Sequence, residues 1–264
     1  MSARPAVLVI AGSDSSGGAG LARDVEAVEA FGADVLPVVT AVTAQSDRRV
    51  LAVHPVPPAI VRAQIEAAFE TRIPDAIKIG MLTNRETVEA IAEALRHVAG
   101  QNIGDVGPDP AIPIVLDPVL VSSSGGALLD EGGRHALKGR LLPLTTLLTP
   151  NVPEAAALLG EAPAASAAAL DQLAQRLLEL GPRCVLLKGG HASEAEAVDR
   201  LACRGESLLR ITAPRIRASR RGTGCALASA IAAQLGAGVP LVIACERAQA
   251  YIGERLRAAA EAGR

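Results

Sequence analysis

The feature that most constrains the fold of this chain is the alternation of short apolar runs with longer amphipathic segments. Six runs are short, continuous and rich in aliphatic residues: Ala6–Ile10, Val35–Thr40, Ala76–Ile79, Ile114–Asp117, Thr146–Thr149 and Val185–Lys188. Such runs are typical of strands that are buried on both faces of a parallel sheet. Segments with helical periodicity lie between them: Leu21–Phe31, Pro58–Thr71, Arg85–Val98 and Ala167–Leu180. The alternation predicts an α/β fold, with a mostly parallel central sheet and helices on both faces.

The C-terminal third departs from this alternation. Ala197–Ala202 and Leu208–Thr212 flank a turn, which is a pattern typical of a β-hairpin. Helical segments of about residues 223–236 and 240–261 follow. No internal repeat and no linker divides the chain, so we expect residues 1–264 to form a single domain.

Composition excludes several classes of function. The chain contains 26 Lys and Arg against 28 Asp and Glu, a formal net charge of −2, and only 1% aromatic residues. Electrostatic binding to nucleic acid needs a basic surface, and base stacking needs aromatic side chains, so we expect no nucleic-acid partner. No apolar segment approaches the roughly 20 residues of a transmembrane helix, so we also expect no membrane partner.

The four cysteines are Cys184, Cys203, Cys225 and Cys245, and none belongs to a CxxC pair. In a chain of this length the spacing predicts free thiols rather than a disulfide framework. Free thiols are typical of a reducing compartment, so we expect a cytoplasmic protein.

A first glycine cluster, Gly12–Gly20, follows the first predicted strand and leads into a helix. Glycines here let the backbone approach a ligand closely, and the helix start favours an anionic group. The cluster lacks the Lys and Ser/Thr of a P-loop, and Arg23 stands where the dinucleotide fingerprint has its third glycine. The alternative interpretation is a tight turn that binds nothing.

A second cluster, Gly222-Thr223-Gly224-Cys225, opens a helix near the C-terminus. Consecutive backbone N–H groups at such a helix start can form an anion hole. A cysteine at the positive end of the helix dipole has a lowered pKa, so the pattern predicts a reactive thiolate at Cys225. The alternative is a loosened turn with a small buried cysteine.

Polar residues follow three further predicted strands. Asn151 and Glu154 could support a hydrated Mg²⁺ together with substrate phosphates, or they could form a capping box at a helix start. Asp117 ends another strand, and Lys188, one of only three lysines in the chain, ends a third. Open α/β sheets bind ligands at the carboxyl ends of their strands, so we expect these residues and both glycine clusters at one site.

In this order the motifs resemble the hydroxymethylpyrimidine/phosphomethylpyrimidine kinase family, enzymes of thiamine synthesis with a ribokinase-like fold. The resemblance covers about residues 6–252 and rests on VIAGSDSSGGAGLARDVEAVEAF, AIKIGML, VLDPVLV, LLTPNVPEA, VLLKGGH and GTGCALASAIAA. It implies a three-layer α/β/α domain that uses ATP and Mg²⁺. The implied reactions transfer a phosphoryl group to a pyrimidine hydroxymethyl group and then to the resulting monophosphate. The resemblance also implies a homodimer.

The resemblance assigns individual residues to parts of the site. The residues implied in the pyrimidine pocket are Gly12, Asp24, Gln45 and Met81. The Gln45 carboxamide, both donor and acceptor, would pair with the aminopyrimidine edge. The residues implied in catalysis and the anion hole are Gly222, Thr223, Gly224 and Cys225. The magnesium–phosphate network would use Asp117, Asn151 and Glu154, and the nucleotide side Lys188, Gly189 and Gly190.

Two positions depart from the family pattern. Family members often have a lysine where this chain has Ser122–Ser124, and often a histidine where it has Arg221. We expect Arg221 to contact a substrate or nucleotide phosphate and to compensate for the lysine absent near Ser123, because arginine suits bidentate phosphate contacts. The alternative is a solvated surface arginine.

Two other functions share parts of this pattern. A pyridoxine/pyridoxal kinase has the same motif layout, but Gln45 favours an aminopyrimidine. A thiamine-precursor sensor would bind ligand without turnover, and the presence of Gly222–Cys225 together with Glu154 argues against it.

Overall fold

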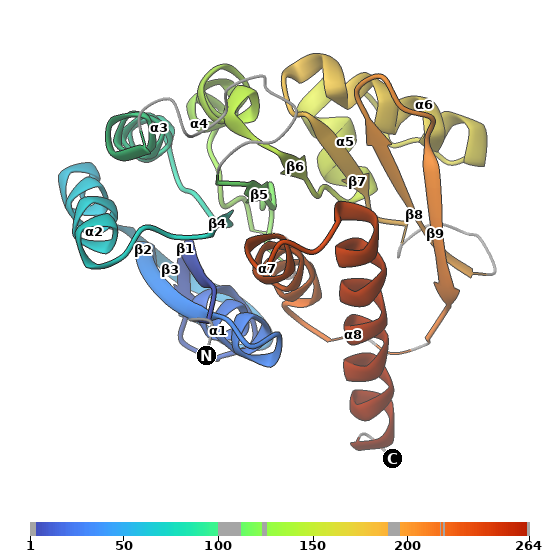
Figure 1. Ribbon diagram of the computed structural model, residues 1–264, viewed down its shortest axis with the longest axis horizontal. Helices are drawn as coiled ribbons and strands as arrows, with labels where there is room; N and C mark the ends of the chain where they lie inside the picture. Colours follow the sequence, from blue (N-terminus) through green and yellow to red (C-terminus); the bar gives the residue numbers. More distant parts are fainter. Residues whose placement is uncertain are drawn as a thin grey trace.

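Nine strands form one sheet in the order β3-β2-β1-β4-β5-β6-β7-β8-β9 (Figure 1). The computed structural model describes residues 4–99, 112–122, 126–189, 196–216, 218 and 220–262. The strands are β1 Ala6–Asp14, β2 Asp34–Gln45, β3 Val50–Pro55, β4 Ala76–Ile79, β5 Ile114–Leu116, β6 Leu147–Leu148, β7 Cys184–Leu187, β8 Glu196–Cys203 and β9 Leu209–Pro214. The six strands from β2 across to β7 are parallel, whereas β3, β8 and β9 pair antiparallel with their neighbours.

Helices cover both faces of this sheet (Figure 1). On one face lie α1 Gly20–Ala30, α7 Thr223–Gly236 and α8 Leu241–Ala262, and on the other α2 Pro58–Thr71, α3 Arg85–Ala99, α4 Glu131–Ala136, α5 Val152–Leu159 and α6 Ala167–Leu177. Because successive side chains of a strand point to opposite faces, β1 contributes to two cores. Leu8 and Ile10 pack with the α2–α6 side, and Val7 and Val9 pack with the α1, α7 and α8 side.

The structure confirms the predicted three-layer α/β architecture. Every predicted strand and amphipathic helix is present. The ends agree within three residues, except that β1 runs on from Ile10 to Asp14 and β2 from Thr40 to Gln45. The sequence pattern does not predict strand β3. It is an edge strand, and although it contains the apolar run Val50–Val53, its residues are exposed or half-buried rather than buried on both faces. Among the described helices, none has the length and apolar character needed to cross a membrane.

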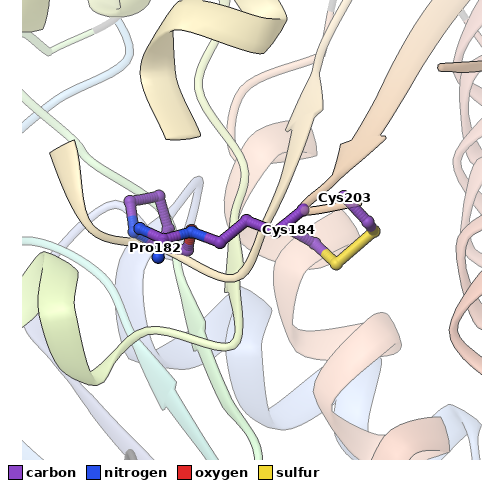
Figure 2. The surroundings of a disulfide bond; sticks show 4 residues. Pro182, Cys184 and Cys203 are labelled. Atoms are coloured by element: carbon purple, nitrogen blue, oxygen red, sulfur yellow. A yellow bond between two sulfur atoms is a disulfide. The ribbon is translucent and has the colours of Figure 1, made fainter. Parts of the chain in front are cut away.

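A disulfide joins Cys184 on β7 to Cys203 on β8 (Figure 2). The two residues are directly opposite each other in the antiparallel pairing, with Cα atoms 4.2 Å apart. Such closely spaced cross-strand positions bring two side chains into contact. The prediction of four free thiols is therefore wrong for this pair, and the inference of a reducing compartment loses its basis. Cys225 and Cys245 are free.

Thiol counting tests this disulfide. Denatured, unreduced protein should release two titratable thiols per chain, and reduced protein four. The Cys184→Ala/Cys203→Ala variant should lose about 3 kcal/mol of unfolding free energy in denaturant titrations, because the bridge closes a loop across a separation of 19 residues. Four titratable thiols before reduction would contradict the disulfide.

Candidate functional site

A cavity of about 680 Å³ lies where the parallel strands end. Its wall contains most of the residues that the sequence predicted: Gly12, Gln45, Met81, Asp117, Asn151, Glu154, Lys188, Arg221, Gly222, Thr223, Gly224 and Cys225. The expectation that distant motifs meet at one edge of the sheet is thus met by the geometry. Asp24 and Gly189 do not line the cavity, and Gly190 lies outside the described residues, as do Ser123 and Ser124.

One end of the cavity is built from the ends of β1 and β2. Met81 packs directly on Gly12, where an added Cβ atom would lie 2.8 Å from the methionine sulfur. The backbone of Gln45 is fixed by Ser15, whose hydroxyl donates to the Gln45 carbonyl at 2.9 Å and accepts its N–H at 2.8 Å. These contacts hold a carboxamide and a thioether at a shared wall, which suits a small heteroaromatic ring with a polar edge.

Asp24 does not take part in this wall. Its side chain is fully buried, where Lys78 Nζ donates to its Oδ1 at 2.7 Å and Ser229 Oγ donates at 2.8 Å. The expectation that Asp24 lines the pyrimidine pocket is therefore wrong. The helical periodicity places Asp24 on a helix, but it does not reveal that a strand presents a lysine to this side chain.

Lys78 is a residue that the sequence reasoning missed. It lies on β4 inside an apolar run, and its side chain is fully buried. Burial lowers the pKa of Lys78, but Asp24, Cys225 and Asp117 together outweigh that effect and raise the pKa. The sequence does contain a signal for this residue: Lys78 interrupts a continuous aliphatic run, and the chain has only three lysines.

Another part of the cavity wall is the N-terminus of α7. Gly222 precedes the helix with φ +75°, a left-handed conformation, and an added Cβ would lie 2.5 Å from the Gly18 carbonyl oxygen. A side chain is therefore excluded at Gly222. Gly222 has no side chain with which to cap this helix, and among the described residues no side-chain cap is found, so the N–H groups of the first turn are left to face the cavity. This geometry fits the predicted anion hole.

Cys225 lies in this first turn but is not set up as a thiolate. Burial raises its pKa from 9.0 to about 12, and the Lys78 charge only partly opposes the effect. That change corresponds to roughly 4 kcal/mol against ionisation, whereas a helix dipole contributes about 0.3–2 kcal/mol. Burial therefore outweighs the dipole, and the prediction of a lowered Cys225 pKa is wrong.

Lys188 connects the ends of β5, β6 and β7. Its Nζ donates to Asp117 Oδ1 at 2.8 Å and lies 4.0 Å from Glu154 Oε2. An added Cβ at Gly224 would lie 3.1 Å from this Nζ, so the ammonium sits over the first turn of α7. Burial lowers and these carboxylates raise the pKa of Lys188, with a net rise. The lysine is thus held as a cation beside the anion hole.

Asn151 and Glu154 form a capping box, which is the structural alternative that the sequence offers for this pair. Asn151 Oδ1 accepts the Glu154 N–H at 2.8 Å, and Glu154 Oε2 accepts the Asn151 N–H at 2.8 Å. Glu154 nevertheless lines the cavity. Burial, opposed by Lys188 and assisted by Asp117, raises its pKa to about 7. The same residue therefore caps α5 and places a titratable carboxyl in the site.

Gly189 has a structural role in the pairing of β7 with β8. Its N–H donates to Asp199 Oδ1 at 2.8 Å, and an added Cβ would lie 1.9 Å from the Val198 carbonyl oxygen. Asp199 also accepts a hydrogen bond from Gln249 at 3.0 Å. Gly189 therefore lets β7 and β8 approach closely, and its N–H is not free for a phosphate.

Asp117 and Glu154, the carboxyl groups nearest the Lys188 ammonium among the ion pairs described, could hold a metal ion. These two carboxyl groups face one lysine, so negative charge is in excess there when both are ionised. Burial raises the pKa of Glu154, and the charge of Asp117 raises it further. A cation would relieve this excess of negative charge. In the described part of the chain no group of three His, Cys, Asp or Glu residues forms a metal site. The arrangement fits a hydrated Mg²⁺ that also binds substrate phosphates.

The comparison with solved structures agrees with this geometry. The chain matches a phosphomethylpyrimidine kinase from Clostridium difficile with a TM-score of 0.79 and 35% identity, covering 95% of this chain and 99% of the other. It matches a pyridoxal kinase from Staphylococcus aureus in complex with ADP with a TM-score of 0.83 and 28% identity, covering 97% and 89%. The fold and site define a kinase of the ribokinase-like class.

Sequence relatives narrow the class. A family model described as Phosphomethylpyrimidine kinase matches residues 14–264. A hydroxymethylpyrimidine/phosphomethylpyrimidine kinase of Rhizobium meliloti is 43% identical over 253 residues, covering 96% of this chain and 90% of the relative. A thiamine biosynthesis bifunctional protein of Geobacter sulfurreducens is 42% identical, and the chain spans 51% of its length. The chain belongs to the phosphomethylpyrimidine kinase family.

The buried Lys78–Asp24 pair yields a stability prediction. Lys78→Met should lower the unfolding free energy by about 3–5 kcal/mol, because it leaves Asp24 as an uncompensated buried charge. The Lys78→Met/Asp24→Asn variant should recover most of that loss in urea titrations. Lys138→Met, at a partly buried lysine without a carboxylate partner among the ion pairs described, is the matched control. Equal losses at the two lysines would contradict the role of the pair.

Glu154 yields a prediction about pH. Its pKa in the folded protein is about 7, above the value of 4.5 for a free side chain, so the folded state keeps a proton that the unfolded state loses. Stability should therefore fall as pH rises from about 4.5 to 7. Glu154→Gln retains a cap acceptor but removes this effect, and should exceed wild type by about 1–3 kcal/mol at pH 8.

The measurement for Glu154→Gln is urea denaturation at several pH values between 4 and 8. At pH 4 the variant and wild type should have nearly equal unfolding free energies. The same substitution at Glu93, an exposed residue of α3, is the control. A difference between wild type and Glu154→Gln that does not change with pH would refute the assignment.

Proposed function

We propose that this protein phosphorylates 4-amino-5-hydroxymethyl-2-methylpyrimidine with ATP and then phosphorylates the resulting monophosphate to the diphosphate. The observation that carries the proposal is that one cavity of about 680 Å³ is lined both by Gln45 and Met81 and by the start of α7, Gly222–Cys225. A ring with a polar edge bound at Gln45 would direct its hydroxymethyl group toward the start of α7. Membership of the phosphomethylpyrimidine kinase family supports the same reaction.

The acceptor half of the site is proposed to recognise the pyrimidine. The Gln45 carboxamide offers a donor and an acceptor to an amino group beside a ring nitrogen. Gly12 and Met81 provide a flat apolar contact for the ring, since they pack against each other in the wall. Pyridoxal has a formyl group at the position of this amino group and a hydroxyl-bearing carbon in place of the adjacent ring nitrogen, so Gln45 favours the aminopyrimidine.

The donor half is proposed to hold the phosphates of ATP. The N–H groups of Gly222–Cys225 and the Lys188 ammonium would neutralise charge on the transferring phosphoryl group. Phosphoryl transfer depends mainly on positioning and on such neutralisation. An apolar part of the cavity wall, formed by Pro214, Ile216, Ile252 and Leu256 among others, would accept the nucleoside.

Asp117 and Glu154 would hold Mg²⁺, which supplies further positive charge at the phosphates when it is bound. Cys225 is proposed as the residue that orients the acceptor oxygen. With its pKa raised to about 12, it is a neutral thiol near pH 7 and serves as a weak donor and acceptor rather than as a strong base. The homodimer implied by the resemblance stays a prediction.

A coupled ADP-release assay tests the proposal. The acceptors are the hydroxymethylpyrimidine, its monophosphate and pyridoxal, each with ATP and Mg²⁺. We expect turnover with both pyrimidines and a lower kcat/KM with pyridoxal. A preference for pyridoxal would replace the proposal with a pyridoxal kinase, which the S. aureus structural similarity makes the second candidate. Pyrimidine binding without ADP release would indicate a sensor.

The Gln45→Met variant tests the acceptor assignment in the same assay. Losing a buried hydrogen-bonding pair costs about 1–3 kcal/mol, so KM for the pyrimidine should rise roughly 5- to 150-fold. KM for ATP should stay the same, because Gln45 is assigned to the ring of the acceptor and not to the phosphates of ATP. Unchanged pyrimidine kinetics would remove Gln45 from the acceptor site.

A further inference from the structure

The side chain of Arg221 joins segments that are far apart in the sequence. Its Nη2 donates to Asp14 Oδ2 at 2.9 Å, and its Nη1 donates to Ser16 Oγ at 2.9 Å. The same Nη1 reaches the Ser46 carbonyl oxygen at 3.1 Å and Asp47 Oδ1 at 3.3 Å. One guanidinium therefore contacts the loop between β1 and α1, the turn between β2 and β3, and, through its own backbone, the start of α7.

The pair with Asp14 is the shielded part of this network. The exposed fractions of the side chains are 18% for Arg221 and 4% for Asp14, against 85% for Asp47. Water and salt screen the Asp47 contact much more strongly than the Asp14 contact. The other Asp14 oxygen accepts the Ser16 N–H at 2.9 Å and the Ser16 hydroxyl at 2.8 Å. Both carboxylate oxygens of Asp14 are thus engaged, and Arg221 is bound to a preorganised loop.

The segments that Arg221 joins are the ones that position Gln45. Gln45 immediately precedes Ser46, and its backbone is hydrogen-bonded to Ser15 in the β1–α1 loop. On the other side, Arg221 directly precedes Gly222, whose left-handed backbone starts the anion hole. One side chain therefore connects the acceptor end of the cavity to its phosphate end.

We propose that Arg221 is a positioning residue that latches the β1–α1 loop and the β2–β3 turn to the start of α7, and so keeps Gln45 in its acceptor-binding place. The proposal rests on the proposed function for the identity of the acceptor. The guanidinium of Arg221 already donates to four acceptor atoms, and two of these are carboxylate oxygens that neutralise its charge. A phosphate would have to displace them, so the latch replaces the phosphate contact expected from the sequence.

Breaking the latch should affect the acceptor and spare the nucleotide. If the closed arrangement of the two loops falls to a minor population, the apparent affinity for the acceptor falls by that fraction. Arg221→Met should raise KM for the unphosphorylated pyrimidine by roughly 10- to 100-fold. KM for ATP should change less than about 2-fold, and kcat at saturating pyrimidine should be largely retained.

Asp14 and Arg48 give the matched variants. Asp14→Asn should reproduce the KM pattern, and the Arg221→Met/Asp14→Asn variant should be no worse than either single variant, because both remove one interaction. Arg48→Met removes a guanidinium from the exposed tip of the same turn and should leave both KM values unchanged. Additive effects of the Arg221 and Asp14 variants would overturn the latch.

Hydrogen exchange of the ligand-free protein tests the latch without any activity. In Arg221→Met the amides of residues 14–20 and 43–50 should exchange faster, while those of β4 and β5 stay the same and serve as a reference for global stability. If faster exchange in Arg221→Met spreads to β4 and β5, the Arg221→Lys variant is measured as well, because lysine keeps a cation for Asp14. In Arg221→Lys the faster exchange should be confined to the two loops. Faster exchange in β4 and β5 of Arg221→Lys would overturn the latch.

The outcomes separate this proposal from its alternatives. A raised KM for ATP or for the monophosphate, with an unchanged KM for the unphosphorylated pyrimidine, would identify Arg221 as a phosphate contact and overturn the latch. No change in kinetics or exchange would make it a surface arginine and overturn it as well. If wild type does not turn over the pyrimidine, the proposed function fails, and the exchange experiment alone decides the latch.

Discussion

The arrangement of the site depends on the buried ion pair between Lys78 and Asp24. This pair and the Ser229 hydroxyl tie β4 to α1 and α7, the two helices that begin at the cavity. A buried pair costs desolvation free energy, so its net contribution to stability is small compared with the cost of breaking it. Its effect is geometric, because only one placement of the helices satisfies both charges. An added Cβ at Gly80 would lie 2.5 Å from the lysine Nζ, so the chain leaves room for this pair at the end of β4.

Charge in the cavity is divided between two ends. At the α7 end, Lys188 and the uncapped helix start attract anions, while Asp117 and Glu154 prevent an excess of positive charge. At the Gln45 end, the charges of Arg221 and Asp14 satisfy each other, so the wall there is polar but locally balanced. A polyanion is thereby favoured at one end and a neutral ring at the other. Burial keeps the Cys225 thiol neutral between them, which leaves the positive field of the helix start available to phosphate.

Several site residues have a structural task as well as the proposed chemical one. Glu154 caps α5 and carries a carboxyl group with a raised pKa into the cavity. Gly222 starts α7 in a conformation that excludes side chains, and it also opens the anion hole. The capping box and the tight turn are therefore compatible with a functional role for the same residues. A cap fixes the direction of a side chain or an N–H group, and a fixed direction is what a binding site needs.

The sequence by itself determined the layer architecture, because strands buried on both faces and amphipathic helices leave their periodicity in the chain. It also brought the glycine clusters, Asp117, Asn151 and Lys188 to one edge, since the carboxyl ends of parallel strands share an edge. The tertiary structure alone decided which side chains meet across that edge. It paired Asp24 with Lys78 instead of a ligand, opposed Cys184 to Cys203 through an antiparallel register, and bound Arg221 to Asp14 across 207 residues. It also raised the pKa of Cys225, because desolvation depends on every neighbour that excludes water, and no local pattern in the sequence records those neighbours.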